Sequence, residues 1–195
     1  MLILFLSLAV TIFAILFSVY YQLTRKTDVF ARHSEGIRGM IMLVCACMNF
    51  LILVLSDAMK TKETIILFLL LACIADIDLM NRKIPTELLL LLGGFVLSRM
   101  FPADQHTLLL IGTGLVIAAA FYLTRNKTGI GLYDILLILL ICLYALSVTA
   151  QLVFTAAFLV LWGATGLIVR RYIKKGERIP LAPLIVLALA LVFRL

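Results

Sequence analysis

Three aspartates lie inside or at the edge of long apolar stretches of the chain, at Asp76, Asp78 and Asp134. An ionisable side chain within a membrane costs about 2.5–3.5 kcal/mol on insertion scales, so such a residue usually serves a function. Asp78 opens an Asp-Leu-Met-Asn-Arg-Lys-Ile-Pro segment that ends at Pro85, and Asp134 closes a Gly-Ile-Gly-Leu-Tyr-Asp segment that begins at Gly129. Two carboxylates beside Gly- or Pro-marked breaks favour acid–base chemistry, and peptide hydrolysis by paired aspartates fits best.

Such hydrolysis needs no metal or organic cofactor. One ionised carboxylate takes a proton from water while a second, protonated carboxyl group polarises the scissile carbonyl, and the closeness of the two groups separates their titrations. Asp78 and Asp134 fall on different predicted helices, so the fold can bring them to one depth. Asp76 lies about 200° around the helix from Asp78, so we expect a structural or modulatory role for it.

Residues beside the two acids are suited to an irregular backbone. Gly129 and Gly131 permit close approach or an unusual turn before Asp134, and Pro85 moves Ile84 away from helical geometry. An irregular edge of this kind is tolerated in a membrane where it lines a wet cavity, and it would suit an extended substrate.

Composition predicts the elements that position these residues. The chain is 65% apolar and 14% charged, which leaves little room for a soluble domain. We predict an all-α fold, a polytopic membrane helix bundle of about eight transmembrane helices of roughly 17–25 residues. The first is predicted to be a retained helix and not a signal peptide, because its apolar run is too long. The predicted spans are 1–23, 39–56, 63–80, 85–101, 107–124, 130–148, 151–170 and 180–195.

Basic residues predict the orientation of these helices. The loops that follow odd-numbered spans hold 13 of the 17 Lys and Arg residues. Positive charge marks cytoplasmic loops, so these loops are predicted to face the cytoplasm, with Asp78 and Asp134 at the cytoplasmic edge of the cell membrane. The net charge of +7 thus orients helices and does not indicate a nucleic-acid partner.

Three motifs together resemble those of type IV prepilin peptidases, bacterial members of the GxGD-type intramembrane aspartyl proteases. The Asp-x₅-Ile-Pro pattern from Asp78 to Pro85 is similar to their first catalytic motif, and residues 129–134 are similar to their G-x-G-x-G-D motif. Residues 179–183, Ile-Pro-Leu-Ala-Pro, resemble the segment that opens the last helix of the family. The resemblance covers roughly residues 63–195, a six-helix catalytic domain, and residues 1–62 would add two leading transmembrane helices with a basic cytoplasmic loop.

The resemblance implies a multi-pass membrane endopeptidase that removes short basic leader peptides from type IV pilin-like or pseudopilin precursors. Asp78 and Asp134 would be the catalytic pair, with Pro85, Gly129 and Gly131 in support and no metal or cofactor. The chain departs from the family pattern at three positions. Tyr133 stands where the family has glycine, Leu136 where it often has lysine, and Thr86 where it usually has Asn or Asp.

Other interpretations stay open. A proton-coupled carrier also needs intramembrane carboxylates, and a catalytically inactive homologue would act as a membrane scaffold. Both acids could also have structural roles only. Asp134 would then be stabilised by the positive end of a helix dipole, and Asp78 would pair with Arg82 one helical turn away. The Gly93-Gly94 pair and the Gly163-x-x-Gly166 pattern predict close helix contacts.

Overall fold

The structure, a computed structural model, describes residues 2–25, 34–55, 61–100, 105–145, 147–169 and 179–194. All regular secondary structure in these ranges is helical, which confirms the all-α prediction. The helices are α1 (Leu2–Arg25), α3 (Glu35–Leu55), α4 (Lys62–Asn81), α5 (Thr86–Arg99), α6 (Gln105–Thr128), α7 (Leu132–Tyr144), α8 (Val148–Val169) and α9 (Ala182–Arg194). Each predicted span coincides with one helix, and the ends differ by at most four residues.

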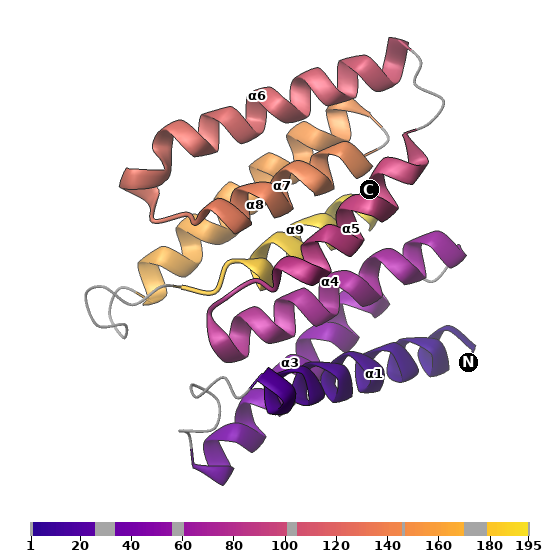
Figure 1. Ribbon diagram of the computed structural model, residues 1–195, viewed down its shortest axis with the longest axis vertical. Coiled ribbons are helices and arrows are strands. Elements are labelled where there is room, and N and C mark those ends of the chain that lie inside the picture. Colours follow the sequence, from indigo (N-terminus) through magenta and orange to yellow (C-terminus); the bar gives the residue numbers. More distant parts are fainter. Residues whose placement is uncertain are drawn as a thin grey trace.

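The helices stack side by side, from α6 at the top of Figure 1 to α1 and α3 at the bottom. Helix α9 is central in this arrangement, because it packs against α3, α4, α7 and α8. Its inward face is built from small and branched residues, including Ala182, Ala188 and Ala190, which are all almost fully buried. Alanine lets neighbouring helices approach closely, so α4 and α7 share α9 as a common partner.

The two leading helices are part of the same packed body. Val10 and Ala14 of α1 and Leu53 of α3 belong to the hydrophobic core that also contains residues of α4, α5, α7 and α9. Helices α1 and α3 pack against each other and against α4. A displacement of α1 or α3 will therefore change the packing of α4.

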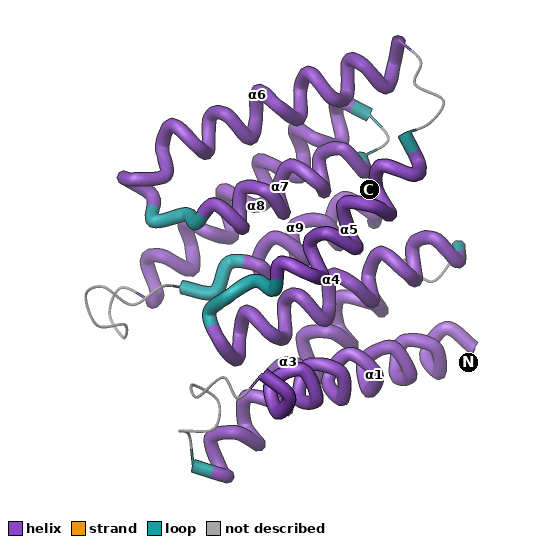
Figure 2. The backbone as a smooth tube through the Cα atoms, in the orientation of Figure 1, coloured by secondary structure: helices purple, strands orange, loops and turns teal. Residues whose placement is uncertain are grey.

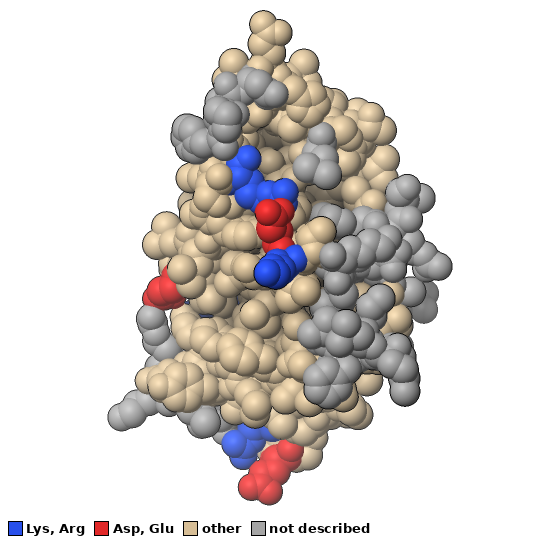
Figure 3. Space-filling view, turned by 90° about the vertical axis from the view of Figure 1, so that its right-hand side faces the viewer, with Lys and Arg blue, Asp and Glu red and all other residues tan. Residues whose placement is uncertain are grey.

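Within the described residues, three helices are long and apolar enough to cross a membrane, over Glu35–Val54, Gln105–Asn126 and Val148–Gly166. The outer surface is apolar too, since Leu90, Val116 and Leu123 are 73%, 70% and 81% exposed. Figure 3 looks onto one end of the molecule, where the described Lys, Arg, Asp and Glu side chains form only a few small groups. The exposed apolar side chains of the helices are unfavourable in water but suit a lipid environment.

The helix break between α7 and α8 lies earlier than predicted. Helix α7 ends at Tyr144, and Ala145 leaves the helix with φ −62° and ψ 136°. Ser147 Oγ then accepts a hydrogen bond of 3.1 Å from Ala150 N. The predicted boundary at residues 148–151 was wrong because this short serine cap starts α8 without any polar loop.

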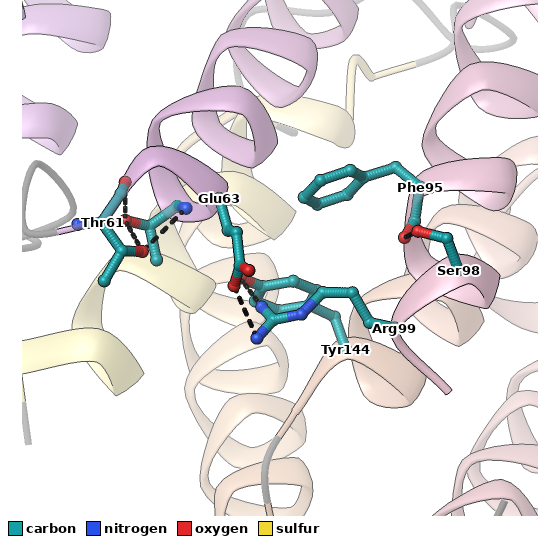
Figure 4. A network of polar contacts seen from close by, with 7 residues as sticks. Thr61, Glu63, Phe95, Ser98, Arg99 and Tyr144 are labelled. Atoms are coloured by element: carbon teal, nitrogen blue, oxygen red, sulfur yellow. Dashed lines mark hydrogen bonds and ion pairs between the residues drawn. The ribbon is translucent and has the colours of Figure 1, made fainter. Parts of the chain in front are cut away.

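A polar network joins α4, α5 and α7 at the end of the bundle that Figure 4 shows from close by. Arg99 forms an ion pair of 2.7 Å with Glu63, and it donates a 2.7 Å hydrogen bond to Tyr144 Oη. Phe95 stacks on the Tyr144 ring with centroids 6.2 Å apart. The network lies at the start of α4 and the end of α7, so it is remote from Asp78 and Asp134.

Candidate acid–base site

Asp78 lies in the last turn of α4 and is 0% exposed. Its Oδ2 accepts a 3.0 Å hydrogen bond from the backbone N–H of Ala182, the first residue of α9. The first and third motifs are therefore in direct contact, although the sequence shows them far apart.

Asp134 is the third residue of α7 and is also 0% exposed. Its Oδ2 accepts a 2.8 Å hydrogen bond from Gly131 N, just before the helix begins. A carboxylate in this position accepts a hydrogen bond from a backbone N–H at the start of the helix, and the positive end of the helix dipole stabilises its charge. Asp134 thus has the helix-start geometry that the structural interpretation predicted.

All three motif loops lie at one end of the bundle. Residues 82–85, 129–131 and 179–181 appear in Figure 2 as teal segments on the left-hand side. Helices α4 and α7, which carry the two aspartates, both pack against α9. The fold thus gathers the three motifs at the same end, with both carboxylates buried there.

The connections around the aspartates need special backbone conformations at two positions. Gly129 has φ +73°, a left-handed conformation that glycine adopts readily, and it donates 2.9 Å to Arg125 O at the end of α6. Gly131 has φ −79° and ψ 161°, which other residues adopt equally well. Arg82 ends α4 with φ +55°, and its backbone N–H donates a 2.7 Å hydrogen bond to Asp78 O, so the two residues remain one helical turn apart.

Pro85 caps the start of α5 with φ −71° and ψ 126°, as its position in the sequence predicted. It is buried, as is the preceding Ile84. Proline fixes φ and has no N–H to leave unsatisfied, so it suits the start of a helix.

Asp76 faces another part of the bundle. It is 1% exposed, and Asn49 Nδ2 of α3 donates to its Oδ1 at 3.0 Å and to its Oδ2 at 2.9 Å. Asp78 instead contacts α9, so the two acids lie on different sides of α4, in agreement with their separation around the helix. Asn49 was missed in the sequence, although a polar residue within an apolar span was a usable signal.

The three departures from the family pattern all lie at the surface. Tyr133 and Leu136 are 39% and 40% exposed, and Thr86 is exposed as well. The larger side chain of Tyr133 is therefore partly exposed at the surface.

Among the residues that the structure describes, no group of three or more His, Cys, Asp and Glu side chains lies close enough to hold a metal ion. No family model, no curated protein and no solved structure matches the chain.

Proposed function

We propose that this protein is a membrane-embedded aspartyl endopeptidase of the prepilin peptidase type, which cleaves leader peptides from type IV pilin-like precursors. One observation carries the proposal. Asp78 and Asp134 are both fully buried, at the end of the bundle where all three motif loops gather. Burying two carboxyl groups lowers the stability of the fold, so their presence at this end favours a functional role.

In the proposed reaction, the two carboxyl groups act on one water molecule. The ionised group takes a proton from this water, which attacks the scissile carbonyl, while the protonated group donates to the carbonyl oxygen. The N–H groups of Ala182 and Gly131 each fix the orientation of one carboxylate. When the C–N bond of the resulting diol intermediate breaks, the first carboxyl group gives the proton that it took from water to the leaving amine. The second carboxyl group recovers a proton from a hydroxyl of the diol, so the pair returns to its starting state without a cofactor.

The proposal places all eight described helices across the cell membrane, with the motif loops at the cytoplasmic face. Its support is the concentration of 13 of the 17 Lys and Arg residues in the loops on that side. Helices α7 and α9 have 13 residues each. They are only about 20 Å long at 1.5 Å per residue, less than the roughly 30 Å hydrocarbon core. Longer neighbours would shield their ends, where irregular backbone can line a wet cavity.

A catalytically inactive scaffold is the second candidate, and it has an observation of its own. Both aspartates bind backbone N–H groups at helix starts, Asp78 at α9 and Asp134 at α7. A carboxylate can be retained for this capping alone. A proton carrier has less support, since its acids usually lie near the membrane midplane.

Purified protein in detergent, incubated with a type IV pilin-like precursor, tests the proposal. We expect cleavage at the junction between the leader and the apolar helix of the precursor, detected by mass spectrometry. The matched control is the same protein with both Asp78→Asn and Asp134→Asn. Equal amounts of intact precursor with the two proteins would reject the peptidase and favour the scaffold.

A further inference from the structure

A groove of about 170 Å³ lies between α1 and the corner where α4 leads into α5. Its walls include Tyr21 of α1, Asn81 of α4, Lys83–Pro85 in the connection and Glu87 of α5. Asn81 is less than one helical turn from Asp78, so the groove lies at the end of α4 that carries the candidate catalytic residue. Pockets for small molecules usually measure about 300–1,000 Å³; this groove suits a side chain or a short stretch of polypeptide.

One wall of the groove offers backbone polar groups. Lys83 and Ile84 lie outside any helix, between the end of α4 and Pro85. In the part of the chain that the structure describes, their N–H and C=O groups form no hydrogen bond. Backbone N–H and C=O groups in proteins are nearly always hydrogen-bonded. A non-helical segment whose donors and acceptors are free can bind a second extended chain by strand-like pairing.

The opposite wall comes from the first helix. Tyr21 Oη donates a 3.1 Å hydrogen bond to Glu87 Oε2, which links α1 to the first turn of α5. The ring of Tyr21 also packs on that of Phe17, with centroids 6.3 Å apart. The Glu87 carboxylate is thereby held at the groove, where it can form an ion pair with a basic side chain.

We propose that this groove binds an extended segment of the polypeptide substrate next to the scissile bond. The backbone of that segment pairs with Lys83 and Ile84, and one of its Lys or Arg side chains forms an ion pair with Glu87. This inference rests on the proposed peptidase function and extends it. It assigns α1, which lies outside the region of family resemblance, a direct part in substrate binding.

Photo-crosslinking tests where the substrate lies. A benzoylphenylalanine is placed at Tyr21 or at Lys83 in protein that carries Asp78→Asn and Asp134→Asn, so that the substrate is not consumed. The probe is a peptide that covers the leader junction and apolar helix of a type IV pilin-like precursor. The control position is Leu97, which is exposed on the same helix as Glu87 but about 15 Å further along.

We expect crosslinks at positions 21 and 83 and none at position 97. Crosslinks that are equally strong at position 97, or absent at 21 and 83, would overturn the groove. These outcomes are separable from the peptidase proposal. Cleavage by the unmodified protein without crosslinks at 21 and 83 rejects the groove alone, whereas crosslinks without cleavage reject the peptidase alone.

Kinetics test the ion pair at Glu87. Glu87→Gln should raise KM about tenfold with kcat unchanged, because a charged interaction made equally in the bound substrate and the transition state is lost. With a precursor whose basic leader residues are replaced by Gln, the same substitution should leave KM unchanged. Equal effects on both precursors would show that Glu87 does not bind a basic side chain. Tyr21→Phe should raise KM less, since Glu87 remains in place.

Discussion

The Asp78 carboxylate lies 3.0 Å from the backbone N–H of Ala182, although 104 positions separate the two residues in the chain. The first N–H groups of a helix have no partner within it, and Pro180 and Pro183 on either side of Ala182 have no N–H at all. Ala182 therefore presents one of the few backbone donors at the start of α9, and Asp78 binds it. The same contact would serve a structural cap or orient a catalytic acid.

Substitution by asparagine separates these two roles at Asp78 and Asp134. The amide oxygen of Asn can still accept from Ala182 N or Gly131 N, so the thermal midpoint in detergent should change little. Cleavage of a pilin-like precursor should nevertheless be abolished, because an amide cannot exchange a proton with its partner acid. Alanine at either position should also remove the cap and lower the free energy of unfolding by about 1 kcal/mol.

Asp76→Asn is the matched control for these variants, since Asp76 faces α3 and not α9. It should retain substantial cleavage per folded molecule. If Asp76→Asn is inactive while Asp78→Asn cleaves normally, the catalytic assignment is wrong. If all of the Asn variants cleave normally, the aspartyl peptidase proposal fails.

Asn49 is expected to matter for stability because its amide binds both oxygens of the buried Asp76. Asn49→Ala leaves a buried carboxyl group without this donor and should destabilise the protein by about 1.5–3 kcal/mol. Adding Asp76→Asn to Asn49→Ala should recover part of the loss, because a neutral amide is less costly to bury than a carboxylate. Unfolding by denaturant in one detergent measures all three variants, and losses that simply add would contradict the pairing.

The sequence predicted the helices well because each is a long apolar run that a polar or Gly- or Pro-marked segment interrupts. Pro85 and Pro180 marked the starts of α5 and α9 to within two residues. The start of α8 was misplaced, since Ser147 caps a helix inside a region with almost no polar residues. A hydropathy pattern does not register a single capping hydroxyl group.

Contacts between helices were harder to predict. Of the predicted close helix contacts, the one at Gly93 is present, since a Cβ there would lie 3.7 Å from Leu140 Cδ2 of α7. Gly94, Gly163 and Gly166 have no atom within 4 Å of the place where a Cβ would lie, so the contacts predicted at these three positions were wrong. A closer approach is at Gly114, where a Cβ would be 3.4 Å from Cys142 Cβ. Small residues show which helix faces can pack closely, but only the three-dimensional fold decides which ones do.

The candidate site shows the same division. Asp78 and Asp134 could be selected from their types and neighbours, since buried acids are rare in apolar segments. Their backbone partners Ala182 and Gly131 carry no side-chain signal, and the contact from Tyr21 to Glu87 joins residues 66 positions apart. These contacts depend on how α1, α4, α5 and α9 pack.

Gly129→Ala should destabilise the protein by about 1 kcal/mol, because φ is +73° there and alanine avoids this conformation. Gly94→Ala is the control, since the new methyl group meets no atom within 4 Å and φ is not positive. In the interior of a helix this change should stabilise by about 0.5–1 kcal/mol. Thermal midpoints that shift in the same direction for both variants would show that backbone conformation does not control the effect.

Gln151 is expected to hold α6, α7 and α8 together. Its Nε2 donates to Leu110 O at 3.0 Å and to Cys142 O at 2.8 Å, and the side chain is fully buried. Gln151→Leu removes both donors and should cost about 2–3 kcal/mol. The neighbouring Leu152 is 59% exposed, so Leu152→Ala should change stability by less than about 0.5 kcal/mol. A similar loss for the two variants would mean that the polar contacts contribute little.

Cysteine labelling in intact cells tests the orientation on which the proposed site of cleavage depends. Cys47 is the exposed one among the four cysteines, so the experiment uses a Cys47→Ser background. Lys83→Cys and Arg125→Cys report on the end with the motif loops, and Lys62→Cys reports on the other end. Because basic residues concentrate in the loops at the motif end, an impermeant maleimide should label only Lys62→Cys until the cells are opened. Strong labelling of Lys83→Cys in intact cells would invert the orientation and place Asp78 and Asp134 on the outer side, where the proposed cytoplasmic reaction cannot occur.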